Sequence, residues 1–269
     1  MGALHEGHLS LIRIAREQCD QVVLSLFVNP SQFNERGDLE RYPRREEHDA
    51  RLAEEAGVDV LFAPSAEEVY PAGFATSVEV LGVTDRLEGV ARGAAHFRGV
   101  TTVVTKLLGM VAPDVAYFGQ KDAQQLAVIR RLVADLNIPV RIEAGPTIRE
   151  PDGLAMSSRN ALLEPHERIR ARALPRALGA ARELVAGDGT AAGPLIDAAR
   201  AVLSAAALEP DYVELVDPDS FEALDRLDRP ALLVLAVRVG EVRLIDNEML
   251  EPAREGLRGR GGLESACSA

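Results

Sequence analysis

The chain has 269 residues, of which 47% are hydrophobic, and it carries a formal net charge of −12 at pH 7. This charge disfavours a nucleic-acid partner, because affinity for duplexes rests on Lys and Arg side chains that neutralise phosphates, and with no Trp and 4% aromatic residues the chain offers little surface for stacking bases. No apolar run approaches the roughly 18 residues of a membrane span, so we expect no membrane partner, no signal peptide and a cytoplasmic enzyme that acts on small molecules.

The first half of the chain alternates between helix and strand patterns. Strand-length apolar runs end at Asn, Pro or Gly, and amphipathic segments lie between them. We expect helices at 8–18, 44–57, 97–111 and 121–137, and strands at 21–29, 58–64, 114–119 and 140–146. Only 77–89 lacks a clear pattern. This alternation predicts an α/β fold with a doubly wound parallel sheet.

The character of the chain changes near residue 147. Ala-rich helices are expected at 167–187 and 193–206, and strands at 211–217 and within 231–246. We therefore predict a first domain over residues 1–147 and a smaller α+β domain over 148–253. The tail, 254–269, is rich in Gly and Arg with little apolar content, and we expect it to be disordered.

The segment MGALHEGH predicts the start of a helix, on one face of which His5 and His8 stand three residues apart. The first N–H groups of a helix lack intrahelical partners and carry partial positive charge, so two imidazoles at this place would form a phosphate clamp. Considered alone, the two histidines are better interpreted as ordinary solvated residues at the start of a helix than as a phosphate clamp. Other motifs must decide between these alternatives.

Polar loops follow the expected strands, and in a doubly wound sheet ligands bind beyond the carboxyl ends of the strands. Gly119 permits a tight turn after 114–119, Lys121 brings a positive charge there, and Asp122 suits an N-cap, a ribose contact or a metal. Lys121 could instead be a solvated residue of the first helical turn. Asn29, Ser31, Gln32 and Asn34 follow the strand at 21–29 in the same way.

The segment 147–160 ends in MSSRN. Ser157 and Ser158 offer hydroxyl donors, Arg159 offers a fork-shaped phosphate donor, and Asn160 suits a helix cap. The Gly and polar residues before them predict a mobile loop that closes over a bound triphosphate. A Ser-rich linker that ends in an N-cap is the alternative.

Taken together, these pieces resemble the pantothenate synthetase family, the ATP-dependent pantoate:β-alanine ligases. The resemblance rests on MGALHEGH, FVNPSQFN, GDLERYPR, HFRGV, YFGQKDAQQL and GLAMSSRN in this order, with DYVELVDP and RLIDN in the last third. It implies a Rossmann-like first domain of the HxGH nucleotidyltransferase type, a smaller second domain and a homodimer. It also implies ATP as co-substrate, Mg²⁺ as cofactor, and pantoate and β-alanine as the small-molecule partners.

The resemblance also assigns residues, position by position. His8 corresponds to the catalytic proton donor, and His5, Lys121 and Arg159 join it as catalytic residues. Gln32 and Gln125 correspond to the pantoate-binding glutamines, Gln32 also serves β-alanine, and Asp122 is matched to Mg²⁺. The ATP-binding positions are Met1, Gly2, Ala3, Leu4, His5, Glu6, Gly7, His8, Gly119, Gln120, Lys121, Asp122, Ile148, Met156, Ser157, Ser158 and Arg159.

The residue types suit the chemistry that the family performs. Attack of a carboxylate on the α-phosphorus of ATP requires alignment and relief of charge repulsion, which the imidazoles, Lys121, the two serines and Arg159 would supply. Two neutral glutamines would hold the acid without adding negative charge. They argue against a second candidate, an HxGH enzyme that adenylylates a phosphate ester, because a phosphate acceptor would favour Arg or Lys there.

The family has a further strand before MGALHEGH, so we expect that Met1 is a misassigned or truncated start. An inactive fragment or a non-catalytic binding protein is therefore a third candidate.

The remaining candidates for chemistry are weaker. Cys19 and Cys267 are too few for a disulfide framework or a thiolate metal site. His48 and His166 lie in charged helices and are expected to be solvated. For His96, a packing or dimer-contact role competes with substrate contact, and we expect Asp246 and Glu248 to be structural.

Overall fold

The four parallel strands of the first half form two pairs in the computed structural model, which describes residues 2–32, 45–185 and 191–252. The first pair joins β1 (Val23–Ser25) to β2 (Val60–Phe62), and the second joins β3 (Val115–Gly119) to β4 (Arg141–Gly145). Within the described ranges β1 and β3 are not paired with one another. Whether a strand from upstream of Met1 lies beside them stays a prediction.

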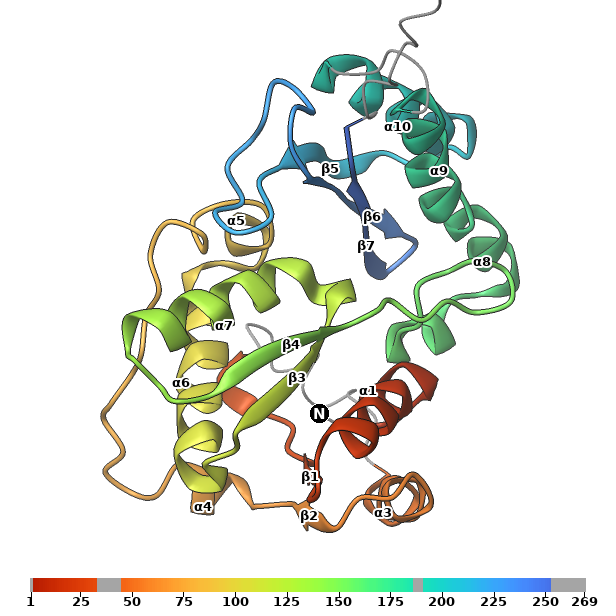
Figure 1. Ribbon diagram of the computed structural model, residues 1–269. Helices are drawn as coiled ribbons and strands as arrows, with labels where there is room; N and C mark the ends of the chain where they lie inside the picture. Colours follow the sequence, from red (N-terminus) through yellow and green to blue (C-terminus); the bar gives the residue numbers. More distant parts are fainter. Residues whose placement is uncertain (1, 33–44, 186–190, 253–269) are drawn as a thin grey trace, which may run out of the picture.

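Helices connect and cover these strands (Figure 1). The chain runs through α1 (Glu6–Gln18), β1, a 3-10 turn η1 (Pro30–Gln32), α3 (Glu46–Glu55), β2, α4 (Ala66–Val69), α5 (Glu88–Arg92), α6 (Ala94–Val111), β3, a 3-10 turn η2 (Gln120–Asp122), α7 (Ala123–Asp135) and β4. The expected helices are thus confirmed with ends shifted by a few residues, and the strands are shorter than expected. The segment without a clear pattern, 77–89, is largely irregular and runs into α5.

The second half packs helices on one antiparallel sheet. After the 3-10 turn η3 (Ser158–Leu162) come α8 (Pro165–Ala171), α9 (Ala173–Val185), α10 (Ala192–Ala205), β5 (Pro210–Val216), β6 (Ala231–Val239) and β7 (Val242–Leu250). The sheet order is β5-β6-β7. The single helix expected at 167–187 is two helices, because Pro175 has no N–H to donate to the carbonyl of Ala171 and so interrupts the hydrogen-bond ladder.

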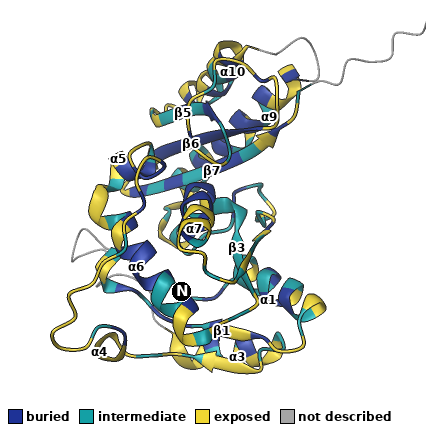
Figure 2. Cartoon of the chain, turned by 60° about the vertical axis from the view of Figure 1, so that its left-hand side comes forward, coloured by how far each residue is buried: buried dark blue, intermediate teal, exposed yellow. Residues whose placement is uncertain are grey.

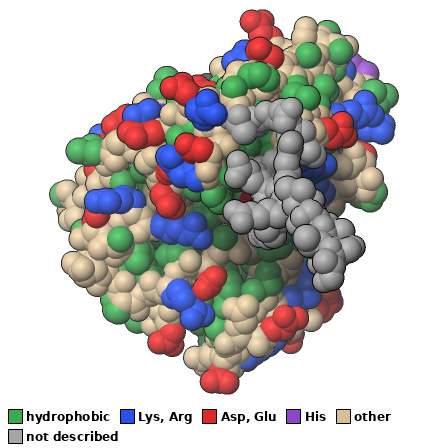
Figure 3. Space-filling model, turned by 45° about the horizontal axis from the view of Figure 1, so that its top comes forward, with side chains coloured by type: hydrophobic (Ala, Val, Ile, Leu, Met, Phe, Trp, Pro, Cys, Tyr) green, Lys and Arg blue, Asp and Glu red, His purple; other side chains and the backbone are tan. Residues whose placement is uncertain are grey.

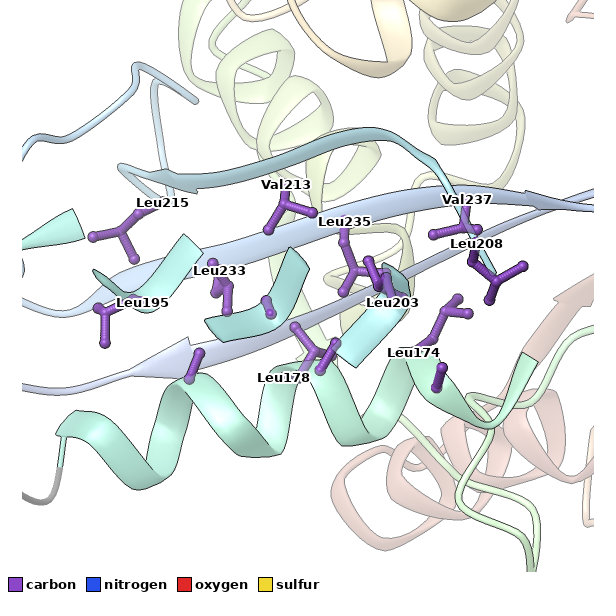
Figure 4. Packing of buried hydrophobic residues seen from close by; sticks show 14 of the residues in the cluster. Leu174, Leu178, Leu195, Leu203, Leu208, Val213, Leu215, Leu233, Leu235 and Val237 are labelled. Atoms are coloured by element: carbon purple, nitrogen blue, oxygen red, sulfur yellow. The ribbon is translucent and has the colours of Figure 1, made fainter. Parts of the chain in front are cut away.

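The central strand β6 is buried on both faces, which explains its continuous apolar sequence. Leu233 and Leu235 point to one face, where they pack with α9 and α10 (Figure 4). Leu232 and Val234 alternate with them and pack with α7 on the other face. Full burial of each such side chain contributes roughly 1.5 to 3 kcal/mol, so this strand ties the two halves together.

Helix α7 lies between the C-terminal sheet and the β3–β4 pair (Figure 2). Its Val128 and Leu132 pack toward β6, while Ile129 packs with α6 and with apolar residues of β3 and β4. The helix is consequently apolar on most of its circumference, and it fixes the carboxyl end of β3 against the C-terminal sheet. The α/β domain with a small C-terminal domain is confirmed, whereas the boundary at residue 147 stays a prediction.

The surface carries interspersed charges. Acidic and basic side chains alternate over the face drawn in Figure 3. Exposed ion pairs such as that between Arg98 and Glu79, at 2.9 Å, contribute at most about 1 kcal/mol each.

None of the helices within the described ranges is long and apolar enough to cross a bilayer. Cys267 and the tail 254–269 lie outside the described residues.

Candidate active site

A cleft with a volume of about 1170 Å³ opens between the two halves of the chain. It is lined from below by the start of α1, by η1 and by the turn after β3, and from above by η3 and the C-terminal sheet. Most of the predicted site residues line it: Ala3, Leu4, His5, Glu6, Gln32, Lys121, Asp122, Gln125, Met156, Ser157, Ser158 and Arg159. The other predicted site residues within the described ranges are not among the lining residues: Gly2, Gly7, His8, Gly119, Gln120 and Ile148. Met1 lies outside the described ranges.

The segment before α1 is held by a carboxylate that sequence patterns did not single out. Asp49 on α3 is 1% exposed, and its two oxygens accept hydrogen bonds from the backbone N–H groups of Ala3 and Leu4, both at 2.8 Å. A buried carboxylate needs such partners. Asp49 therefore fixes the approach to the helix start, but it lies in a strongly charged helix where nothing in the sequence distinguishes it.

The two histidines stand at the N-terminus of α1 with their rings stacked, centroids 4.0 Å apart at 23°. The backbone N–H of His5 donates to Nδ1 of His8 at 3.3 Å, so the proton of a neutral His8 ring resides on Nε2. Burial and the neighbouring His5 lower the pKa of His8 to about 3, and burial also lowers that of His5. At neutral pH His8 is thus a neutral hydrogen-bond donor, and its expected role as proton donor stays a prediction.

The predicted phosphate-binding loop folds directly onto this helix start. The N–H of Gly7 donates to the thioether sulfur of Met156 at 3.2 Å. The N–H of Met156 in turn donates to the carbonyl of Ile148 at 2.8 Å, and Glu150 N–H donates to Leu154 at the same distance, which closes a hairpin. The loop therefore places Ser157 and Ser158 beside the clamp, whereas its expected motion stays a prediction.

The same loop is anchored to the C-terminal sheet. Arg149 pairs with Asp246 of β7 at 2.7 Å, and the side chain of Asp246 is almost fully buried. Arg168 of α8 pairs with Glu150 and Asp152. The charge of Asp246 is thus matched by Arg149. Its expected structural role stays a prediction.

The turn after β3 brings Lys121 and Asp122 to the cleft. Lys121 Nζ lies 3.3 Å from Asp122 Oδ1. Desolvation raises the pKa of Asp122, but the charge and hydrogen bond of Lys121 outweigh it and lower the pKa overall. From β7, Asn247 donates to the carbonyls of Gln120 and Lys121 at 3.1 and 2.9 Å. Asn247, which the sequence did not reveal as functional, thus sets the geometry of this turn.

Gln32 is oriented by a buried asparagine. Asn29 is 3% exposed, and its Nδ2 donates to Gln32 Oε1 at 3.2 Å and to the carbonyl of Gly99 at 3.0 Å. Its Oδ1 accepts from the hydroxyls of Ser31 and Tyr70, both at 2.8 Å. Among the described residues, the amide NH₂ of Gln32 has no hydrogen-bond partner. Gln125 reaches the same cleft from the first turn of α7.

A buried charge cluster joins the halves at the far side of the cleft. Glu88 accepts from Arg92 on its own helix at 2.8 Å, from Arg243 of β7 and from the hydroxyl of Tyr212 of β5 at 2.8 Å. Burial alone would raise the pKa of Glu88, but the hydrogen bond from Arg243 and the charges of both arginines lower it to about 2. Arg92 is thereby held in the cleft, a position that no sequence pattern indicated.

Within the described ranges, no group of three or more His, Cys, Asp or Glu side chains is arranged to hold a metal ion. Magnesium, however, is usually bound through one or two carboxylates together with substrate phosphates. Asp122 beside Lys121 fits that mode, in which phosphate oxygens complete the coordination. The described residues do not form a site in which protein groups alone would coordinate the ion.

Comparison with known proteins places the chain in one family. The pantoate-beta-alanine ligase family model matches residues 1–249. A pantothenate synthetase of Rhizorhabdus wittichii is 55% identical over 254 residues, covering 94% of this chain and 89% of that protein. The crystal structure of pantothenate synthetase from Thermus thermophilus has a TM-score of 0.90 and 48% identity, covering 94% of this chain and 91% of that one. A Francisella tularensis pantoate-beta-alanine ligase complexed with beta-gamma ATP and beta-alanine has a TM-score of 0.76 and 35% identity, covering 93% and 87%.

Proposed function

Because this chain belongs to the pantoate-beta-alanine ligase family, we propose that its cleft is where ATP activates pantoate and where β-alanine receives the pantoyl group. The activity is the ATP-dependent condensation of pantoate with β-alanine, which yields pantothenate, AMP and pyrophosphate. This membership excludes the hypothesis that the chain adenylylates a phosphate ester. The alternative of an inactive fragment is distinguished by the activity measurements.

One observation carries the assignment of the site. The N-terminus of α1 lies in the same cleft as Lys121, the loop at Ser157 to Arg159, and the two glutamines. His5 lines the cleft and its ring stacks on that of His8. The helix N-terminus, Lys121 and the loop offer cations and N–H donors to phosphates. The two glutamines offer neutral amides to a hydroxy acid. One cleft therefore contains groups suited to bind each reactant of the first step, ATP and pantoate.

In the first step a carboxylate oxygen of pantoate attacks the α-phosphorus of ATP, and pyrophosphate leaves with the electrons of the broken P–O bond. Both reactants are anions, so repulsion and alignment dominate the barrier. Gln32 and Gln125 hold pantoate, while Lys121 and Arg159 face the phosphates. Neutral His8 donates a hydrogen bond from Nε2 to the developing charge, consistent with its pKa of about 3.

In the second step the amine of β-alanine attacks the acyl carbon of pantoyl adenylate, and the C–O bond to AMP breaks. The acyl phosphate is open to hydrolysis, so water must be excluded. The hairpin at residues 148–156 covers the start of α1 through the contact between Met156 and Gly7. We propose that it shields the intermediate in this way.

We further propose that Mg²⁺ binds beside Asp122, where it would neutralise charge on the triphosphate. The family resemblance also implies a homodimer, which light scattering of the purified chain would test. Because its co-substrate is ATP, we expect the enzyme to work in the cytoplasm.

The experiment measures two reactions of the purified chain. Pyrophosphate exchange into ATP, in the presence of Mg²⁺ and pantoate but without β-alanine, reports the first step. Pantothenate formation after addition of β-alanine reports the whole reaction. Exchange that depends on pantoate, followed by pantothenate formation, supports the proposal. A folded chain that binds ATP yet performs neither reaction contradicts it and favours the inactive fragment.

A further inference from the structure

His96 lies in the third position of α6, and its ring borders the cleft beside η1. Its Nδ1 is 2.8 Å from the backbone carbonyl oxygen of Gln32. A carbonyl oxygen can only accept, so Nδ1 carries the hydrogen and the neutral ring has its lone pair on Nε2. The contact therefore determines the tautomer as well as the orientation of the ring.

The second ring nitrogen of His96 is Nε2. Within residues 2–32, 45–185 and 191–252 it has no hydrogen-bond partner. His96 is only partly buried and is one of the residues that line the cleft, so the cleft gives access to its ring. The ring is also fixed laterally by an edge contact with Phe97, with centroids 5.2 Å apart.

The groups around the ring keep it neutral. Burial is the largest influence and lowers the pKa of His96, and the charges of Arg92 on α5 and Arg159 on η3 lower it further. The backbone carbonyl of Gln32 and the carboxylate of Glu88 oppose this shift. The N-terminus of α6 adds partial positive charge, which also disfavours imidazolium. At neutral pH the ring is therefore in the form that can take up a proton.

This position matters because of what the second step requires. The amine of β-alanine is a primary alkylamine, whose pKa near that of lysine, about 10.4, makes it an ammonium ion at neutral pH. An ammonium ion has no lone pair with which to attack. Gln32, whose carbonyl holds His96, is the residue expected to contact both pantoate and β-alanine.

We propose that His96 is a catalytic base for the second step. The ammonium group of β-alanine gives one proton to Nε2 of His96, and the released lone pair forms the C–N bond to the acyl carbon. The C–O bond to the phosphate breaks, AMP departs with its electron pair, and the remaining excess proton on nitrogen passes to water. His5 and His8 are poorly placed for this task, because they stand at the phosphate end of the cleft and Nδ1 of His8 already accepts a hydrogen bond.

The inference rests on the proposed function, and its test separates the two steps. In the variant His96→Asn the side-chain amide can still donate to the carbonyl of Gln32, so η1 keeps its support while the basic nitrogen is lost. Pantoate-dependent pyrophosphate exchange involves no amine and should stay within about twofold of the parent chain. Transfer to β-alanine should fall by about 10² to 10⁴, the usual contribution of a general base.

The pH dependence distinguishes a base from a positioning residue. In the variant the transfer rate should rise about tenfold per pH unit below the pKa of the amine, because only free amine then reacts. Transfer at the parent rate would overturn the proposal. A parallel loss of exchange and transfer in a folded variant would also overturn it, since His96 would then act only by holding Gln32.

A measurement on the parent chain covers the case in which the variant does not fold. Single-turnover transfer should decline toward acid pH as His96 is protonated, while exchange keeps its rate over the same range. Identical pH profiles for the two reactions would contradict the proposal. If the parent chain shows neither exchange nor transfer, it is the proposed function that fails.

Discussion

Gly99 sits in the first turns of α6, where the helix touches the turn that carries Gln32. A Cβ atom at this position would lie 2.4 Å from the carbonyl oxygen of Ser31 and 2.8 Å from the backbone nitrogen of Gln32. Both are backbone atoms, which cannot swing away as a flexible side chain would. The substitution Gly99→Ala should therefore push η1 outward.

The size of this displacement follows from the contact distance. Ordinary van der Waals contact begins at 3.4 Å, so the oxygen of Ser31 must retreat by about 1 Å. A misplacement of about 1 Å at a reacting group can cost roughly 100-fold in rate. We expect pantoate-dependent exchange to fall by about 10- to 100-fold, chiefly through a higher KM for pantoate, with the KM for ATP little changed.

The substitution should also lower the free energy of unfolding modestly. Overpacking typically costs about 1 to 3 kcal/mol, whereas replacing Gly by Ala within a helix contributes up to about 1 kcal/mol. The net loss in the free energy of unfolding should thus be about 2 kcal/mol or less. Urea unfolding monitored by circular dichroism would measure it.

The matched control is Gly109→Ala, near the other end of the same helix. A Cβ at Gly109 meets no atom within 4 Å. This variant should keep the kinetic constants of the parent chain and gain slightly in stability. A Gly99→Ala variant with unchanged exchange and unchanged KM for pantoate would refute the reasoning that this contact positions Gln32.

Three further predictions concern the residues around the cleft. The pKa of Glu88 is lowered from 4.5 to about 2, so its contribution to stability, about 3 kcal/mol, is fully present above pH 4.5 and is lost as pH falls through about 2. Thermal melts between pH 3 and 7 should show this decline in the parent chain and a flatter, lower profile in Glu88→Gln; equal profiles would contradict it. Asn247→Asp places a carboxylate against the carbonyls of Gln120 and Lys121. Initial rates should therefore show a KM for ATP raised about tenfold. An equal rise in the KM for pantoate would contradict the prediction, because the whole cleft would then be disturbed. Lys121→Met should lower the exchange rate by about 10² to 10³ with the melting temperature nearly unchanged, and retention of the parent rate would remove Lys121 from the catalytic residues.

Local sequence was sufficient for most of the helices and for the order of the motifs. Amphipathic periodicity predicted α1, α3, α6, α7 and α10, because each buries apolar residues against neighbouring elements and exposes polar residues to solvent. Ends of elements were less certain: β1 covers only Val23–Ser25 of a longer apolar run. Leu26 and Phe27 are buried by tertiary contacts without belonging to the strand, and apolar residues alone cannot separate these two situations.

The sequence by itself thus predicted many of the groups that line the cleft, among them His5, Lys121, Gln32 and the MSSRN segment, each of which follows a recognisable turn. Only the tertiary structure decided what holds them. Asp49 accepts a hydrogen bond from Ala3 before α1, 46 residues away in the sequence. Asn247 bonds the turn at Lys121 over a separation of 126 residues, and Glu88 bonds Arg243 over a separation of 155 residues. A short motif carries its own turn chemistry, whereas a buried polar partner is selected by packing between elements distant in the chain, and that selection leaves no local pattern.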